Sequence, residues 1–347
     1  MDGIAKMSPR ERADVFVASS GRRGGISASI MEKDFWVCWA LKRIFVSIQF
    51  PLHLIFKGGT SLSKVFRVIE RFSEDVDLSF DRRELGFQTE RDPEKAASGK
   101  KQRALLDQLQ KECKTVIRDR FVPALIEDFR TILGDSKNGA ATAWSISIDP
   151  EDKQAVLFHY PQAVALQGIV MPAYVSPYVR LELGARSDSW PAGEHTITPY
   201  SAELFPDMFT AASCKVKALE AVRTFWEKTT ILHKEAHRSA PFNKKERLSR
   251  HYYDLYQLSK TDIAKRALKQ MELLERVVEH KKVFFRSSWA HYETARPGSF
   301  RLVPPEERLA ALRADYAQMQ TMIFGEYPEW TTIIEGLGKL ENKINKL

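Results

Sequence analysis

Cysteine and long apolar runs are both scarce in this sequence. Its three cysteines lie far apart and form no Cys-x-x-Cys pair: Cys38, Cys113 and Cys214. This spacing argues against a zinc site and against a disulfide framework. The longest apolar stretches, such as residues 35–48, are interrupted by charged side chains, and none approaches the ~20 apolar residues that a membrane-spanning helix needs. We therefore expect no membrane partner.

The amino terminus also lacks the apolar core of a secretory signal. Charged residues occupy its first turns: Asp2, Lys6, Arg10, Glu11 and Arg12. Together with the scarcity of cysteine, this predicts a cytoplasmic protein. Internal repeats and low-complexity tails are absent as well, so the sequence does not predict a repeat architecture.

The length and composition are those of a globular protein. The chain has 347 residues, of which 44% are hydrophobic and 28% are charged, so it can bury a sizeable core. We predict two lobes, at residues 1–219 and 220–347.

The chain is basic, with a formal net charge of +8 and a pI of about 9.2. This charge favours a polyanionic partner, which could be a nucleic acid, a nucleotide or an acidic protein. Basic residues gather in one segment: Lys234, His237, Arg238, Lys244, Lys245, Arg247, Arg250 and His251. We expect an electrostatic patch there, although scattered Lys and Arg also serve simply to keep a chain soluble.

A glycine pair follows a short apolar run. Residues 52–56 have the length and residue types of a buried strand, and Lys57-Gly58-Gly59-Thr60-Ser61 comes directly after it. Glycines let backbone amides approach a phosphate closely. Thr60 or Ser61 can cap a helix over residues 62–69, so that its N-terminus faces a polyanion. Alone, such a turn is more often ordinary strand-to-helix chemistry.

Two aspartates lie on the next predicted strand, at residues 75–80. Asp75 and Asp77 alternate there with apolar residues, so both carboxylates point to one face. Two acids this close repel each other at pH 7 unless a divalent cation lies between them, and oxygen ligands suit Mg²⁺ or Mn²⁺. Alone, the pair is more often a solvated strand face. After the glycine turn, it predicts a nucleotidyltransferase active site.

Three further residues are candidates to complete this chemistry. Glu182, on a predicted strand at residues 178–183, would add the third acid that two-metal sites commonly need, or it pairs with Arg180 on an exposed face. Lys228 emerges from the apolar stripe of a predicted helix and points either to solvent or to a phosphate. Asp254 orients Lys228 or the attacking hydroxyl, or it is an ordinary acid near a helix N-terminus.

The other patterns are helical and extended. Ser29 and Glu32 have the spacing of a capping box in front of an apolar helix over residues 30–48, which gives Glu32 a structural role. A helical pattern over residues 100–133 is kinked or divided at Pro123. Extended runs are predicted at residues 144–148 and 156–160, and the chain is largely helical beyond residue 220.

At these motifs, and along almost its whole length, the sequence resembles the AbiEii-type nucleotidyltransferase toxins, which include the MenT-like toxins. The resemblance is carried by residues 32–36, 57–61, 71–78, 180–186, 223–228, 231–233, 250–255 and 302–304. It implies an α/β (α+β) fold, in which a polymerase-beta-like nucleotidyltransferase lobe with a small mixed sheet precedes a helical C-terminal lobe. His251 stands where the family often has an aspartate.

The resemblance also implies roles for the candidate residues. Gly58, Gly59 and Thr60 or Ser61 would hold the triphosphate of an NTP, next to Lys57. Asp75 and Asp77 would bind Mg²⁺ or Mn²⁺, with Glu182 as the third acid, while Lys228 and Asp254 match later motifs of the family. The protein would be the toxin of a bacterial toxin–antitoxin or phage-defence operon, with a cognate antitoxin as partner.

We therefore expect transfer of a nucleoside monophosphate from an NTP to an acceptor hydroxyl, with release of pyrophosphate. The preferred acceptor is the 3′ end of tRNA, contacted by Lys244, Lys245, Arg247 and Arg250. Two alternatives stay open: the same chemistry on a protein or small-molecule hydroxyl, and a nucleotide-binding protein that acts without catalysis.

Overall fold

The structure is a computed structural model, and it describes residues 1–135, 143–238 and 247–347. Within these residues the strands form a seven-stranded sheet in the order β3-β4-β5-β2-β1-β7-β6. The strands are β1 (Leu54–Lys57), β2 (Asp75–Phe80), β3 (Ser145–Ile148), β4 (Ala155–His159), β5 (Val179–Gly184), β6 (Ala192–Ile197) and β7 (Cys214–Leu219). The pairs β2–β5 and β1–β7 are parallel, and the other neighbours are antiparallel. This confirms the predicted mixed sheet.

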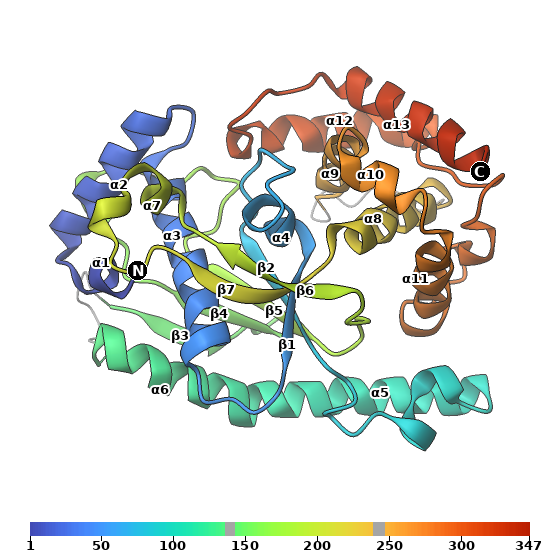
Figure 1. Ribbon diagram of the computed structural model, residues 1–347, viewed down its shortest axis with the longest axis horizontal. Coiled ribbons are helices and arrows are strands. Elements are labelled where there is room, and N and C mark those ends of the chain that lie inside the picture. Colours follow the sequence, from blue (N-terminus) through green and yellow to red (C-terminus); the bar gives the residue numbers. More distant parts are fainter. Residues whose placement is uncertain (136–142, 239–246) are drawn as a thin grey trace.

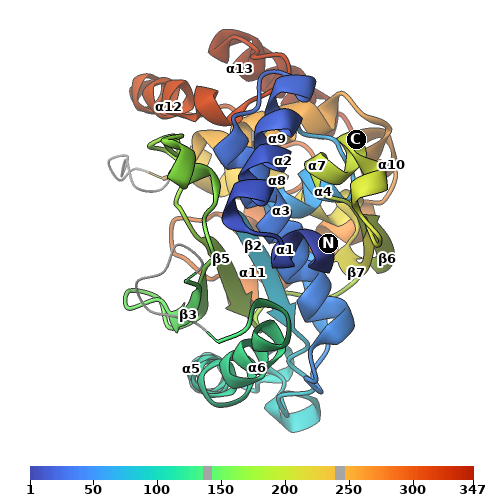
Figure 2. The same cartoon turned by 90° about the vertical axis from the view of Figure 1, so that its left-hand side faces the viewer.

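Helices surround the sheet (Figure 1). Those that precede or interrupt the strands are α1 (Asp2–Lys6), α2 (Pro9–Arg23), α3 (Ala28–Lys42), α4 (Gly58–Lys64), α5 (Gly99–Val116), α6 (Val122–Leu133) and α7 (Tyr200–Leu204). Those that follow the last strand are α8 (Ala221–Ala236), α9 (Ser249–Ser259), α10 (Asp262–Ala267), α11 (Met271–Phe284), α12 (Glu306–Met319) and α13 (Trp330–Asn345). Figure 2 shows α12 and α13 at one end of the molecule and α5 and α6 at the other. The helical region beyond residue 220 is thus confirmed, and its separation as a lobe stays a prediction.

The helix α3 forms much of the core, because nearly all its residues are buried, including the charged Glu32, Lys33 and Asp34. Trp36 and Trp39 are fully buried and contact each other edge to face. Trp39 also packs against Phe129 of α6, and both tryptophans contact Phe158 of β4. The helix ends at Lys42 and continues as a π-helical turn, Arg43–Ser47, so the expected helix over residues 30–48 is recovered as two segments.

The capping box expected for α3 was wrong. The N-cap of α3 is Ser27, whose side chain accepts a hydrogen bond from the backbone N–H of Ile30. The carboxylate of Glu32 instead accepts hydrogen bonds from the backbone N–H groups of Ala163 and Val164. Glu32 therefore still has a structural role, but it fixes a distant loop, a contact that local spacing does not reveal.

The division of the long helical pattern near Pro123 is confirmed. A π-helical turn, Ile117–Phe121, separates α5 from α6, and Pro123 lies in the first turn of α6. The chain stays helical through this turn, and proline cannot donate the backbone N–H that an uninterrupted α-helix would use at residue 123, so the regular pattern is broken there.

The sheet contains two strands that we did not predict, β6 and β7. They form one edge of the sheet, where β7 also pairs with β1. The last strand ends at Leu219 and α8 begins at Ala221, so the sheet is complete before the C-terminal helices begin. None of the described helices is both long enough and apolar enough to cross a membrane.

Candidate active site

The helix α4 begins at the glycine pair itself. Gly58 has a φ of 78° and starts the first turn, and Lys57 is the N-cap without a side-chain hydrogen bond. Thr60 donates a hydrogen bond to the backbone oxygen of Ser73 at 3.1 Å, and Ser61 donates one to the oxygen of Gly58 at 2.8 Å. The expected helix over residues 62–69, capped by Thr60 or Ser61, was therefore wrong. Both hydroxyls are buried and bond the backbone, so they do not line the candidate site.

The acid pair lies directly against this turn. Asp75 and Asp77 share one face of β2, and an added Cβ on Gly58 would come within 1.9 Å of the Oδ2 atom of Asp77. Glycine is therefore needed at residue 58 for the close approach as well as for the positive φ. On the parallel strand β5, Glu182 is the register partner of Asp77.

Burial and neighbouring charge act on Asp75 and Glu182. Burial raises the pKa of Asp75; Arg250 opposes this shift, and the charges of Glu74 and Asp77 add to it. Burial, followed by the charges of Asp77 and Asp75, raises the pKa of Glu182. A cluster of this kind favours any cation that enters it.

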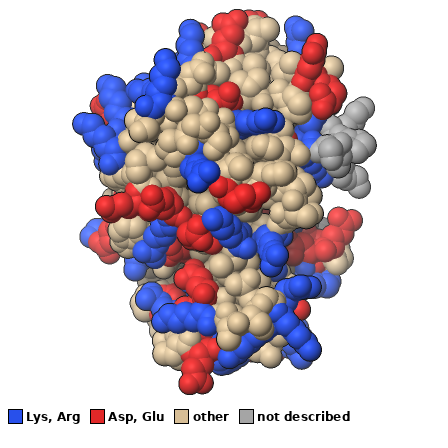
Figure 3. Space-filling view, turned by 90° about the vertical axis from the view of Figure 1, so that its right-hand side faces the viewer, with Lys and Arg blue, Asp and Glu red and all other residues tan. Residues whose placement is uncertain are grey.

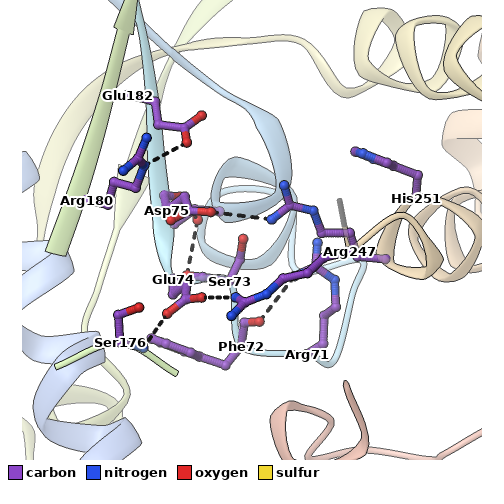
Figure 4. A network of polar contacts seen from close by, with 12 residues as sticks. Arg71, Phe72, Ser73, Glu74, Asp75, Ser176, Arg180, Glu182, Arg247 and His251 are labelled. Atoms are coloured by element: carbon purple, nitrogen blue, oxygen red, sulfur yellow. Dashed lines mark hydrogen bonds and ion pairs between the residues drawn. The ribbon is translucent and has the colours of Figure 1, made fainter. Parts of the chain in front are cut away.

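Two arginines contact the outer carboxylates. Arg250 Nη1 lies 3.4 Å from Asp75 Oδ2. Arg180 Nε donates to Glu182 Oε1 at 3.0 Å (Figure 4). Among the described residues, no three His, Cys, Asp or Glu side chains gather closely enough to hold a metal ion. The oxygen donors of Asp75 and Asp77 suit Mg²⁺ by their chemistry, whereas Glu182 lies beside them and is hydrogen-bonded to Arg180.

A buried carboxylate on α9 holds two cations at this site. Arg71 Nε and Nη2 donate to the two oxygens of Asp254 at 2.7 and 2.8 Å, and Lys228 Nζ donates to the same carboxylate at 2.6 Å. Burial alone would raise the pKa of Asp254, but Arg71 and Lys228 outweigh burial and hold the pKa below its ordinary value. Asp254 is fully buried, so its interpretation as an ordinary surface acid was wrong, and it does contact Lys228.

Lys228 also contacts His251, the residue that departs from the family pattern. Its Nζ lies 3.1 Å from His251 Nδ1. Burial, followed by the charges of Lys228 and Arg250, lowers the pKa of His251 well below its ordinary value. The ring is therefore neutral near pH 7, and Nδ1 accepts a hydrogen bond from the lysine.

These groups line one cavity of about 160 Å³. Its lining residues are Lys57, Gly58, Gly59, Arg71, Ser73, Asp75, Asp77, Glu182, Thr224, Glu227, Lys228, Ile231, Arg250 and His251. The volume is below the ~300–1,000 Å³ of ordinary small-molecule pockets. We had not assigned functions to Arg71, Ser73 and Glu227. Arg71 and Ser73 belong to the 71–78 motif, and Glu227 precedes Lys228, so their proximity to candidate residues was the available signal.

The residues grouped as nucleic-acid contacts have different positions. Arg250 faces the acid pair. Arg247 Nη1 donates to Glu74 Oε1 at 2.6 Å (Figure 4). The guanidinium of Arg247 also lies over the ring of Tyr174, 4.1 Å from its centroid. Lys244 and Lys245 lie outside the described residues. At the other end of the basic segment 234–251, Lys234 and Arg238 contact a different side chain of the chain. Both lie over the ring of Trp289.

The glycine-led helix turn, the Asp-x-Asp pair on the neighbouring strand and the facing cations together define a nucleotidyltransferase. The family described as nucleotidyl transferase AbiEii toxin, type IV toxin–antitoxin system, matches residues 39–335. Since this match spans most of the chain, the chain belongs to the AbiEii nucleotidyltransferase toxin family. A family of this kind implies an NTP substrate, a divalent metal and an antitoxin partner.

Two solved structures are also similar to the chain. The MenT4 nucleotidyltransferase toxin of Mycobacterium tuberculosis is 13% identical, with a TM-score of 0.44, over 96% of this chain and 97% of that one. JHP933 of Helicobacter pylori is 12% identical, with a TM-score of 0.34, over 92% and 98% of the two chains. No curated protein sequence matches the chain.

Proposed function

We propose that this toxin transfers a nucleoside monophosphate from an NTP to the 3′ end of tRNA, in a reaction that depends on Mg²⁺ or Mn²⁺. One observation carries the proposal: carboxylates on adjoining strands face the fixed cations Arg71 and Lys228 across a single cavity. Phosphoryl transfer needs this arrangement, because the protein contributes mainly positioning and charge stabilisation.

Each group has a role in this scheme. Asp75 and Asp77 would hold the metal, which when bound supplies Lewis-acid activation of the acceptor hydroxyl and offsets charge on the triphosphate. Lys57, Gly58 and Gly59 line the cavity beside the acids and would contact the phosphates. Lys228 would stabilise the charge that develops during transfer, and Asp254 acts as the positioning residue that fixes it.

The formal charge of +8 and the resemblance to the toxin family support tRNA as the acceptor. The test is incubation of the protein with each α-labelled NTP, purified tRNA and Mg²⁺, followed by separation of RNA, protein and small molecules. Label in tRNA, lost with EDTA and in Asp77→Ala, is the expected result. Label only in protein or in a small molecule would favour the other acceptors. NTP binding without any transfer would favour a non-catalytic role.

A further inference from the structure

A second cavity, of about 620 Å³, lies beyond the acid cluster. It is formed by residues 81–95 after β2, residues 187–192 at the start of β6, one residue of β7 and one of α11. Side chains that matter here are Lys95, Asp188, Trp190, Lys217 and Arg276. Unlike the active-site cavity, it has the volume of an ordinary ligand pocket.

A chain of ion pairs joins the two cavities. Glu227, in the active-site cavity, accepts from Arg223 Nε at 3.1 Å, and Arg223 Nη1 donates to Asp188 Oδ2 at 2.9 Å. Asp188 also accepts from Arg276 Nε at 2.6 Å. Arg223 is fully buried, so this chain fixes the position of one cavity relative to the other.

Trp190 presents an aromatic surface in the second cavity. Its side chain is 52% exposed, and the guanidinium of Arg276 lies 4.7 Å from its ring centroid. Its backbone oxygen accepts a hydrogen bond from Arg223 Nη1 at 2.6 Å. Arg223 thus fixes the backbone at Trp190, and Arg276 covers one face of the ring. About half of the residue stays exposed, so a flat ligand can stack on the part of the ring that Arg276 leaves uncovered.

Two lysines of the cavity have no acidic partner among the described residues. Lys95 and Lys217 are exposed and make no ion pair within residues 1–135, 143–238 and 247–347. The lining acids Asp81, Asp92 and Asp188 each pair with an arginine of the lining. The two lysines therefore leave the lining with an excess of positive charge. The side of the molecule that carries α11, the helix of Arg276, intermixes Lys and Arg with Asp and Glu and shows no broad basic surface (Figure 3). The proposal therefore depends on individual lysines of the cavity and not on an extended basic face.

We propose that the second cavity binds one nucleotide of the single-stranded acceptor RNA, with its base stacked on Trp190 and its phosphates near Lys95 and Lys217. This inference rests on the proposed function, because it assigns a position to the acceptor strand. A flat base suits the exposed ring, and phosphates suit unpaired lysines. The cavity would thus determine which acceptor is used, while transfer takes place at the acid pair.

The experiment compares Trp190→Ala and Lys217→Gln with two matched controls. Trp190→Phe keeps an aromatic surface. Lys215→Gln removes the same charge from the same face of β7 but lies outside the cavity. It also removes an exposed ion pair with Glu194, at 3.4 Å, and such a pair contributes little to stability. Binding of a fluorescent single-stranded oligoribonucleotide with the tRNA 3′ sequence is measured by anisotropy at two salt concentrations, and KM is measured separately for tRNA and for NTP.

We expect Trp190→Ala to weaken oligonucleotide binding by roughly five- to a hundredfold, the loss typical of one stacked base. Lys217→Gln should flatten the salt dependence, and both variants should raise KM for tRNA without changing KM for NTP. Trp190→Phe and Lys215→Gln should resemble the wild type. Unchanged oligonucleotide binding in Trp190→Ala would overturn the inference, as would displacement of the oligonucleotide by AMP at equal concentration, because the site would then take a free nucleotide.

The two proposals fail in different ways. If the wild type transfers nothing to RNA but Trp190→Ala still loses oligonucleotide affinity, tRNA as acceptor is refuted, and the cavity is a site for single-stranded RNA that has no acceptor role. If transfer to tRNA is intact in every variant, the proposed function stands and the cavity proposal is refuted.

Discussion

Replacing Gly58 by alanine should displace the carboxylate of Asp77 and so inactivate the enzyme. The added Cβ would lie 1.9 Å from Asp77 Oδ2, whereas real Cβ contacts are essentially never closer than 3.0 Å. The carboxylate or the turn must therefore move by about 1 Å, and a misplacement of that size at a reacting centre costs on the order of a hundredfold in rate. The positive φ of 78° adds a separate cost of roughly 1–2 kcal/mol in stability.

Gly134 supplies a matched control, since it has a φ of 72° and no atom within 4 Å of an added Cβ. Gly134→Ala should lose only the free energy of unfolding that its positive φ costs, and Gly58→Ala should lose at least as much because of the added clash. Only Gly58→Ala should lose transfer of labelled NMP per folded molecule. If both variants keep wild-type turnover, the contact between the turn and Asp77 has no part in catalysis. The reasoning would also be refuted if Gly134→Ala lost activity to the same extent.

Four further predictions concern the charged groups. Asp75→Ala and Asp77→Ala should each abolish transfer of labelled NMP while the melting temperature changes little, because each removes one of two repelling carboxylates. Lys228→Ala should lower turnover at least about a hundredfold, whereas a purely structural lysine would change only the melting temperature. Asp254→Asn should lower the free energy of unfolding by roughly 3–5 kcal/mol at pH 7. The folded-state pKa of Asp254 lies below the ordinary 3.8. The difference in free energy of unfolding between Asp254→Asn and the wild type, measured in urea, should therefore shrink as the pH falls below 3.8. Burial lowers the pKa of Lys281 to about 7 from an ordinary 10.5. The protonated lysine therefore lowers the free energy of unfolding. This destabilisation is complete below pH 7 and disappears as the pH rises towards 10.5. Lys281→Met should therefore stabilise the protein by on the order of 3 kcal/mol at pH 6 and much less at pH 10, and equal effects at both values would contradict this account.

The features that the sequence predicted correctly are local ones. Alternation on one strand is enough to place Asp75 and Asp77 on a common face, since side chains of a strand point to opposite faces in turn. Alternation was also visible in β7, where Lys215 and Lys217 are exposed and Val216 is buried. Alternation over so few residues does not by itself define a strand, and the pairing of β7 with β1 depends on a segment far away in the chain.

The features that the sequence could not reveal depend on residues far apart in the chain. Arg71 and Asp254 are separated by 183 residues, and nothing in the spacing of either motif indicates that they form a bidentate pair. In the same way, Lys33 is buried because it donates to Glu74 and to the backbone oxygen of Ser176. Glu74 directly precedes Asp75 in the chain, so Lys33 of the 32–36 motif stabilises the start of the acid strand. None of residues 32–36 lines the cavity.

The position of Asp254 explains why a costly buried ion cluster is present at this site. Burying charged groups seldom increases stability, because the loss of hydration offsets most of the attraction. Here one carboxylate on α9 fixes Lys228 of α8 and Arg71 of the segment between α4 and β2, so elements from both sides of the cavity are joined at one point. Both cations are thereby held in place before any substrate binds. Charge that is already oriented needs no reorganisation when phosphate charge develops, and this is the condition under which a fixed cation lowers a reaction barrier most.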